Sequence, residues 1–355
     1  MRHYFSDIQF KLFLIVLLII ILYIFLKSKY LSFESSKYIY ELRKKLNISN
    51  EFNKIYSDLF YKAKSGGTSK PISVRKTIKS YNIEKDKGIL LSTIGKKENL
   101  YIREFVKYYQ QLNFSKIIIF DNNDINGEVF DNILNDYIKN NFVEIIDIRG
   151  FSSSQIAVIN YCYQKYKKLY DWIAFFDIDE FLYIKDNLDI NKYLYNERFQ
   201  KCESIAFNWH IYDDDGLEKY ENKPLIERFK NLKYRAVQSK SIIRGNLDNL
   251  IFPSVHICAI NVNYFCDSTG KRIFPPSFLS TPLTGNYLAY IKHFYTKTAE
   301  EFCLKINRGD AQFKDKTIFS RILYFFQINK ITKNKIKIIE NCTHLNLSKL
   351  LNHNA

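Results

Sequence analysis

Residues 172–182 read WIAFFDIDEFL, and the fold and the chemistry of the chain both depend on this stretch. The apolar run from Trp172 to Phe176 is typical of a strand buried on both faces. Asp177 ends the run and Asp179 follows it, so two carboxylates stand where the strand breaks. Hard Mg²⁺ or Mn²⁺ ions prefer such oxygen ligands, together with phosphate oxygens of a substrate. The spacing therefore predicts a divalent-metal site at the carboxyl end of a strand.

More strands and helices alternate on the amino-terminal side of this stretch. GILLSTI (88–94), KIIIFD (116–121) and FVEIID (142–147) have the pattern of buried strands, and helix-like segments at 99–112, 133–138 and 155–166 separate them. This order predicts an α/β fold with a mostly parallel, doubly wound sheet flanked by helices. In such sheets ligands bind at the carboxyl ends of strands, where both Asp121 and Asp177 lie.

Composition narrows the class of protein. The chain has 355 residues, of which 46% are hydrophobic and 25% charged, a balance that excludes bulk disorder and a polytopic membrane protein. Lys and Arg outnumber Asp and Glu by 53 to 37, which gives a net charge of +16. A protein with such a net charge usually binds nucleic acid, a lipid surface or a phosphorylated small molecule. Because the basic residues are dispersed and no nucleic-acid motif occurs, we expect no nucleic-acid partner.

Six cysteines are scattered along the chain without a CxxC pair: Cys162, Cys202, Cys258, Cys266, Cys303 and Cys342. The spacing argues against a zinc ribbon or a thioredoxin-like site, and at this length it does not signal a disulfide framework. We expect buried or idle thiols. The alternative is a Cys258–Cys266 bridge across a loop in an oxidising compartment.

Residues 1–27 are predicted to form a transmembrane signal anchor. The run LFLIVLLIIILYIFL (12–26) contains neither a charge nor a helix breaker, and Ile8 and Phe10 extend it toward the length that spans a hydrocarbon core of about 30 Å. A cleaved signal peptide is the alternative, but residues 27–30 offer no small-residue cleavage site. We expect a single-pass membrane protein, whose orientation is left open because basic residues lie on both sides of the run.

Three further regions follow the predicted anchor. Residues 28–87 include SGGTSKP (65–71) and are predicted to be a stem or linker. Residues 88–311 carry the strand and helix pattern and are predicted to be the catalytic domain. Residues 312–355, rich in Lys, Ile and Asn, are predicted to be a helical tail.

Blocks of sequence in a fixed order identify a family. They are KKENLYIREFVKYY (96–109), IIIFDNND (117–124), QIAVINYCYQKYKKLYDWIAFFDIDEFL (155–182), FNWHIYDDDG (207–216), PLIERF (224–229), KSIIR (240–244), VH (255–256) and IKHFYTKTAEEFCLKINRGDA (291–311). Together they resemble the glycosyltransferase family 92 and family 2-like group of GT-A enzymes. The resemblance covers roughly residues 90–311.

The resemblance implies a GT-A fold and a metal-dependent glycosyltransferase. Such an enzyme moves a hexose from a nucleoside-diphosphate sugar to a hydroxyl of a glycan or glycolipid acceptor. A galactose-like sugar, a UDP-sugar donor and inversion at the anomeric carbon come from the family. The metal, Mn²⁺ or Mg²⁺, would stabilise the departing diphosphate. Asp177 and Asp179 would supply its carboxylate ligands, and the family pattern places His293 as the third.

The same resemblance assigns the donor and acceptor sites. Lys297 and Arg308 match the carboxyl-terminal block and would hold phosphates, Arg as a bidentate fork and Lys as a point charge. Asp121 would accept hydrogen bonds from the nucleoside, and Glu98 lies in the first strand-to-helix loop of the same pocket. Trp209 is either a platform for the acceptor sugar or a core residue.

An inverting transfer also needs a general base. Asp213, Asp214 and Asp215 are adjacent carboxylates whose mutual repulsion raises at least one pKa, and Asp214 is the predicted base. The alternative is a solvated turn closed by Gly216, and Glu180 and Glu227 are further candidates for the base.

Rival functions and the compartment are open at this level. The rivals are an Asp-dependent phosphohydrolase, a membrane-tethered basic binding module and a non-catalytic sugar-binding relative. The phosphohydrolase is disfavoured because Phe181 stands where its Thr or Ser would be. The catalytic domain is expected in the cytoplasm if the source is bacterial, and in the Golgi lumen if it is eukaryotic.

Overall fold

The computed structural model describes residues 87–151, 155–252, 254–256, 262–274, 283, 287–308, 318–345 and 347. The predicted anchor, and the predicted stem up to residue 86, lie outside these ranges. Within them, no helix combines the length and the apolar character that crossing a membrane requires.

The amino-terminal half is a parallel sheet with crossover helices, as predicted. Its strands lie in the order β3-β2-β1-β4, and every neighbouring pair is parallel. The elements along the chain are β1 (Ile89–Gly95), α3 (Asn99–Gln111), β2 (Lys116–Asp121), α4 (Asp131–Lys139), β3 (Val143–Asp147), α5 (Gln155–Tyr166) and β4 (Trp172–Phe175). Gly95, Asp121 and Asp147 are in register, so the carboxyl ends of β1, β2 and β3 meet at one edge.

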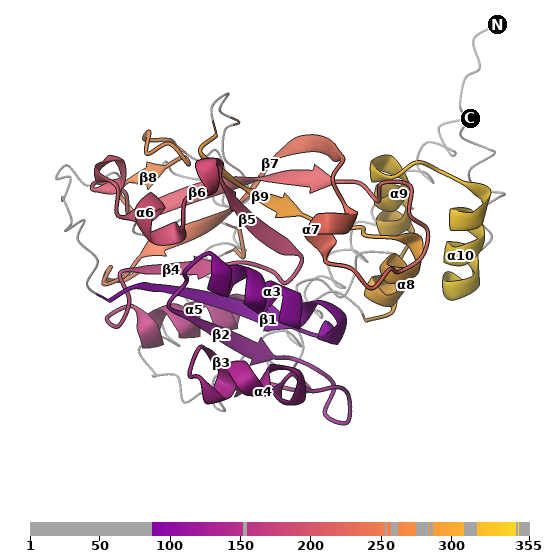
Figure 1. Ribbon diagram of the computed structural model, residues 1–355, viewed down its shortest axis with the longest axis horizontal. Helices are drawn as coiled ribbons and strands as arrows, with labels where there is room; N and C mark the ends of the chain where they lie inside the picture. Colours follow the sequence, from indigo (N-terminus) through magenta and orange to yellow (C-terminus); the bar gives the residue numbers. More distant parts are fainter. Residues whose placement is uncertain are drawn as a thin grey trace, which may run out of the picture.

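Helices cover both faces of this half of the sheet (Figure 1). Alternation along each strand explains why, since Ile89 and Leu91 point to one face and Leu90 to the other. The first two pack in a core cluster with apolar residues of α3 and α4, whereas Leu90 packs with those of α5. The near-continuous apolar composition of β1 and β2 is therefore a consequence of burial on two sides.

The second half of the sheet is mixed, which corrects the prediction of a mostly parallel one. From β4 the order continues β7-β6-β9-β5, and β8 pairs with β6. The pairs β4–β7, β6–β7 and β5–β9 are antiparallel, whereas β6–β9 and β6–β8 are parallel. Antiparallel neighbours need no crossover helix, so the alternation that predicted the first half says nothing about this one. The elements are β5 (Glu180–Ile184), β6 (Ser204–Tyr212), β7 (Leu232–Arg244), β8 (Phe265–Cys266) and β9 (Ala289–His293), with the short helices α6 (Ile190–Leu194) and α7 (Leu225–Arg228).

Among the described residues, three helices follow β9 and lie at one end of the molecule: α8 (Ala299–Arg308), α9 (Ile318–Ile328) and α10 (Lys333–Thr343) (Figure 1). Phe302, Phe325 and Ile339, one from each helix, are buried in a shared cluster. The described part of the predicted tail is thus helical and packs on α8.

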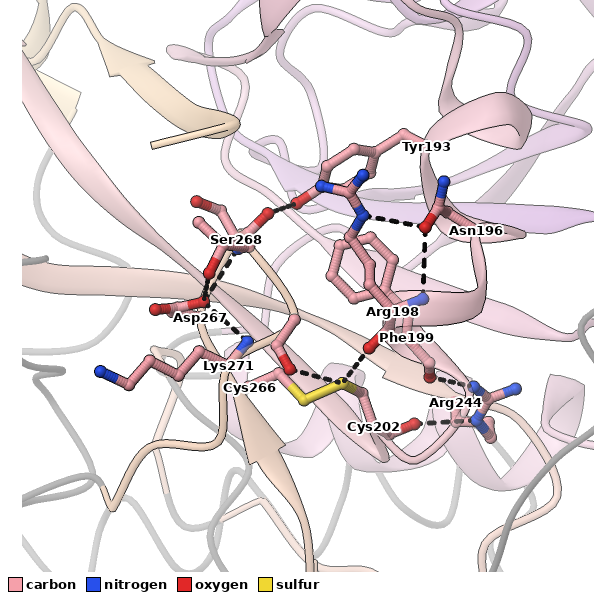
Figure 2. Close-up of a disulfide and its surroundings, with 12 residues drawn as sticks. Tyr193, Asn196, Arg198, Phe199, Cys202, Arg244, Cys266, Asp267, Ser268 and Lys271 are labelled. Carbon is pink, nitrogen blue, oxygen red and sulfur yellow. Dashed lines mark hydrogen bonds between the residues drawn. A yellow bond between two sulfur atoms is a disulfide. The ribbon is translucent and has the colours of Figure 1, made fainter. Parts of the chain in front are cut away.

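Two disulfides contradict the expectation of idle thiols. Cys202 bonds Cys266 and Cys303 bonds Cys342, while Cys162 is a buried free thiol. The proposed Cys258–Cys266 bridge is wrong because Cys266 is bonded to Cys202. The partners are 64 and 39 residues apart, so only the folded chain brings them together. Around the first bond, Arg244 donates hydrogen bonds to the carbonyls of Cys202 and Phe199 (Figure 2).

The Cys303–Cys342 bond should contribute to the stability of the folded chain. Replacing both residues with Ser should lower the free energy of unfolding by about 2–4 kcal/mol, because the unfolded chain regains the freedom of a long loop. Denaturant unfolding followed by circular dichroism measures the change. Non-reducing peptide mapping of the wild-type chain is the control, and it should recover both disulfides. The Cys162 thiol should stay unmodified by an alkylating reagent until the chain unfolds. A double variant that unfolds at the wild-type denaturant concentration would contradict the expectation.

Candidate active site

The loop from β4 to β5 carries the Asp177-Ile178-Asp179 motif, and its carboxyl-terminal end is hydrogen-bonded to the residue that follows β9. The backbone N–H of Phe294 donates to the carbonyl of Asp179 over 3.0 Å. Glu180 is in register with His293 in the antiparallel β5–β9 pair. The motif is therefore held between the end of the parallel half of the sheet and the end of β9.

Asp179 is the centre of a buried charge cluster. Its Oδ2 accepts a hydrogen bond from Lys305 Nζ over 2.6 Å and lies 3.8 Å from Lys297 Nζ. Its Oδ1 lies 3.6 Å from His293 Nε2. Burial alone would raise the pKa of Asp179, but Lys305, Lys297 and His293 outweigh it and hold the pKa well below its usual range. The carboxylate is therefore ionised and compensated.

Both lysines at Asp179 are buried cations supported by aromatic rings. Lys305 also donates to the carbonyl of Tyr295 over 2.9 Å, and its Nζ lies 3.7 Å from the centroid of that ring. Lys297 Nζ lies 4.4 Å above the Tyr101 ring. Burial lowers the pKa of each lysine, against the attraction of Asp179. Lys297 has a left-handed backbone with φ 53°, a conformation that is costly for a side chain other than Gly or Asn and that concentrates at functional sites.

Glu98 and Arg308 form a neighbouring ion pair. Arg308 Nη1 donates to Glu98 Oε1 and, over 3.2 Å, to the carbonyl of Lys96. Lys305 and Arg308 are three residues apart on α8, so both project from one face of the helix. The structure thus brings Glu98, Lys297 and Arg308, predicted as donor-binding residues, to the same cluster as Asp179.

The start of α8 explains how this helix is held in place. Thr298 and Glu301 form a capping box, in which the backbone N–H of each donates to the side chain of the other over 3.2 Å. Glu301 also accepts hydrogen bonds from Nη1 and Nη2 of Arg228, both over 2.8 Å, in the interior of the protein. Burial would raise the pKa of Glu301, and Arg228 with Thr298 lowers it below its usual range. Because these contacts fix the first turn of α8, they also fix the positions of Lys305 and Arg308 farther along the same helix.

Asp177 has partners of its own. Its Oδ2 accepts from Lys240 Nζ and its Oδ1 from Gln155 Nε2, both over 2.8 Å. Its side chain is 35% exposed, in contrast to the buried Lys240 on β7. Lys240 Nζ also lies 3.6 Å from Glu180 Oε2. Burial raises the pKa of Glu180 well above its usual range, against the attraction of Lys240.

The predicted metal ligands are only partly assembled. Asp179 and His293 lie together, whereas Asp177 is turned to Lys240 and Gln155. In the described ranges no three His, Cys, Asp or Glu side chains gather as a metal site would require. Burial lowers the pKa of His293, so its ring is neutral, as a metal ligand must be. The carboxylate oxygen of Asp179 suits Mn²⁺ or Mg²⁺, and the imidazole nitrogen of His293 fits the softer Mn²⁺ better than Mg²⁺.

Trp209 lies beside the same histidine. Its ring centroid is 4.3 Å from that of His293 and 5.1 Å from that of His256. It is half-buried, so one part of the ring packs in the protein while another is accessible. Burial lowers the pKa of His256 to about 4, so this second ring is also neutral near pH 7.

Asp121 lies at the same edge of the sheet, on the Glu98 side. It is 1% exposed, and its Oδ1 accepts from the backbone N–H of Asn123 over 2.9 Å. Asn123 in turn accepts from the backbone N–H of Lys97, one residue before Glu98. Burial raises the pKa of Asp121 above its usual value.

The three adjacent carboxylates after β6 are tied into their own turn. Asp213 accepts from the N–H of Asp215, and Asp215 accepts from the N–H of Lys230. Asp214, the predicted base, is 1% exposed and forms a 2.6 Å ion pair with Lys335 of α10. Burial raises the pKa of Asp214, and Lys335 lowers it in part. These contacts give Asp214 a structural role and give its assignment as the base little support.

Comparison with known proteins identifies the family. The sequence profile described as glycosyltransferase family 92 matches residues 89–320, more than half of the chain. The chain belongs to glycosyltransferase family 92. This membership confirms the resemblance carried by the sequence blocks.

Named relatives of this family 92 chain occur in plants. Galactan beta-1,4-galactosyltransferase GALS2 of Arabidopsis thaliana is 29% identical over 39% of this chain and 28% of its own length. GALS3 of the same organism is 31% identical over 39% of this chain and 29% of its own length. A glycosyltransferase family 92 protein of Oryza sativa subsp. japonica is 21% identical over 58% of this chain and 35% of its own length. The chain therefore spans about a third or less of each of these relatives.

Solved structures resemble the family 92 chain only distantly. Residues 1–349 of S. aureus TarS, in complex with UDP-GlcNAc, align with a TM-score of 0.35 and 10% identity over 72% of this chain and 79% of that fragment. A TM-score this low supports no conclusion about ligand or mechanism.

Lys240 and Lys305 were not among the predicted site residues. Lys305 stands in the last matched block, three residues before Arg308, and this helical spacing was the available signal. Lys240 reads as part of strand KSIIR, and nothing nearby in the sequence pairs it with Asp177, 63 residues away.

The ion pair of Asp214 with Lys335 can be tested directly. Asp214→Asn leaves a buried ammonium without its partner and should lower the free energy of unfolding by about 3–5 kcal/mol. Chemical unfolding of the purified chain measures it. Asp213→Asn, in the same turn, is the matched control and should cost much less. Equal stability of the two variants would show that the pair contributes nothing.

Proposed function

We propose that this chain is a glycosyltransferase with a GT-A fold that transfers a hexose from a nucleoside-diphosphate sugar to a hydroxyl of a glycan or glycolipid. The observation that carries the proposal is ionised Asp179, buried among His293, Lys297 and Lys305 in a member of family 92. A cluster with this charge suits a diphosphate, whose negative charge grows as the bond to the sugar breaks.

The cations of the cluster would hold the diphosphate. Lys297, Lys305 and Arg308 are positioned near Asp179 by α8 and the loop before it. Arg308 offers a fork of donors, and each lysine offers a point charge. Asp179 and His293 would hold Mn²⁺ or Mg²⁺, an ion that supplies Lewis-acid stabilisation of the departing diphosphate when bound. Half-exposed Asp177 would then face the donor.

The donor and acceptor follow from the named relatives. Two of them are galactan galactosyltransferases, so we propose UDP-galactose as donor, inversion at the anomeric carbon and a β-linked galactan as the first acceptor to try. Asp121 and Glu98 would line the nucleoside side of the pocket. The accessible part of the Trp209 ring, beside His293, would contact the acceptor sugar.

The proposed general base lies in the carboxylate turn after β6. Asp214 remains the predicted base, but its pair with Lys335 would have to open before it could accept a proton. Asp213 is half-buried and follows β6 at the edge where His293 ends β9. Loss of turnover in Asp213→Asn, with stability retained, would move the assignment to Asp213.

The disulfides bear on the compartment. Two disulfides within one α/β domain are typical of proteins that fold in an oxidising compartment. We therefore propose that the domain faces the Golgi lumen, with residues 1–27 as its membrane anchor. No nucleic-acid partner is part of this proposal, because the basic residues are dispersed along the sequence and no nucleic-acid motif occurs.

Asp179 should be essential for turnover. Release of UDP from UDP-galactose with a galactan acceptor should fall at least about a hundredfold in Asp179→Asn, since the diphosphate loses the group that organises its cations. A donor screen with a coupled nucleotide assay measures this, with Mn²⁺ and with EDTA. Lys292→Met, next to His293 but directed to Tyr183 and Tyr212, is the matched control and should retain activity. Absence of turnover with every nucleotide sugar in the wild type would refute the proposal.

A further inference from the structure

Aromatic rings lead from the proposed acceptor site at Trp209 to the surface of the protein. The ring beside Trp209, that of His293, lies 5.7 Å from the ring of Tyr295 between centroids. Tyr295 in turn lies 5.2 Å from Tyr324 of α9, and the hydroxyl of Tyr324 lies 3.0 Å from that of Tyr234 on β7. Tyr295 and Tyr324 are half-buried, whereas Tyr234 is 40% exposed. We call this set the aromatic strip: Trp209, Tyr295, Tyr324 and Tyr234.

The register of the strands places both ends of the strip on one face of the sheet. Ile211 of β6 is in register with His293 of β9 on one side and with Tyr234 of β7 on the other. Directly paired residues point to the same face, and so does Trp209, two residues before Ile211. Because two strand spacings separate His293 from Tyr234, the strip continues for about 10 Å beyond the acceptor site.

A small apolar cluster holds the rings in place from below. Ile211 of β6, Ala236 of β7 and Ile328 of α9 are buried together. Trp209 and Tyr324 both pack against this cluster. Helix α9 and the two strands therefore fix the positions of the rings independently of any ligand.

The chemistry of the strip suits a carbohydrate. Tyr and Trp side chains present an apolar ring to the C–H face of a sugar and a polar atom to its hydroxyls. The Nε1 atom of Trp209 has no hydrogen-bond partner among the described residues, so it is an unsatisfied donor beside the acceptor site. Lys305 Nζ already lies 3.7 Å from the centroid of Tyr295. The rings left to contact sugars are those of Trp209, Tyr324 and Tyr234.

We propose that Trp209, Tyr324 and Tyr234 are successive acceptor subsites, so that the acceptor is a chain of several sugars. This inference rests on the proposed function. The reacting end of the chain lies at Trp209, and the sugars behind it run over α9 and the amino-terminal part of β7. The protein therefore gains affinity from sugars that it does not modify.

The dependence of KM on acceptor length tests the proposal in the full-length wild-type protein. With UDP-galactose as donor, KM for β-1,4-linked galactooligosaccharides should fall at least about tenfold from the disaccharide to a chain of about five sugars, because remote sugars add binding energy. Nucleotide release measures KM. Binding in the presence of UDP can also be followed without turnover by intrinsic fluorescence. The chain has two Trp residues and Trp172 is 1% exposed, so a change on adding the acceptor reports on Trp209.

Tyr234→Ala tests the outermost subsite. KM for the five-sugar chain should rise about tenfold, towards that of the disaccharide, with a much smaller change in kcat, as expected when binding away from the reacting atoms is lost. Tyr234→Phe keeps the ring and should restore most of the affinity. Phe274→Ala removes a 68% exposed ring near the other end of β6 and is the matched control, which should keep wild-type values. Melting temperatures report whether each variant folds.

The outcomes separate this inference from the function on which it rests. Turnover with the same KM for every acceptor length supports the proposed function and overturns the strip as a set of subsites. A folded Tyr234→Ala variant with the wild-type KM for the long chain overturns it as well. If the strip instead docks a second copy of the chain, size-exclusion chromatography should show an oligomer that Tyr234→Ala disrupts, and acceptor length should have no effect. Absence of turnover with every nucleotide sugar refutes the proposed function, and the fluorescence titration with short and long galactooligosaccharides then decides whether the strip binds them.

Discussion

Burial of the Asp179 carboxylate is the constraint on which the rest of the site depends. A carboxylate out of water is unstable unless polar and charged partners reach it, and its partners, two lysines and a neutral histidine, come from parts of the chain more than a hundred residues away. His293 arrives on β9, Lys297 in the following loop and Lys305 on α8. The β5–β9 pairing, the bond from Phe294 to Asp179 and the capping box of α8 are the contacts that deliver them.

The sequence predicted what depends on local pattern. Apolar runs of strand length and helical spacing predicted β1 to β4 and the parallel half of the sheet, because β1, β2 and β4 are buried on both faces and the edge strand β3 is partly buried. Of the residues predicted from the motif at Asp177 and from the block at 291–311, Asp179, His293 and Lys297 lie together in the structure. These features depend on residues close together in the chain, so a single sequence displays them.

What escaped prediction depends on contacts between distant residues. Strand direction in the second half of the sheet cannot be deduced from apolar runs, which look alike in parallel and antiparallel pairs. The partners of Cys202 and Cys303 lie 64 and 39 residues away. Asp214 resembled a solvated or catalytic turn until Lys335, on a helix more than a hundred residues later, was seen beside it. Lys240 and Lys305 read as ordinary strand and helix residues until their carboxylate partners were known.

The ion pair and the disulfide that hold α10 limit where this protein can be truncated. The family match ends at residue 320, inside α9, and an expression boundary placed there would discard Lys335 and Cys342. Asp214 would then be left buried without its cation, Cys303 would be an unpaired thiol, and the apolar side of α8 would face water. A minimal catalytic fragment must therefore extend through α10, beyond the point at which similarity to the family stops.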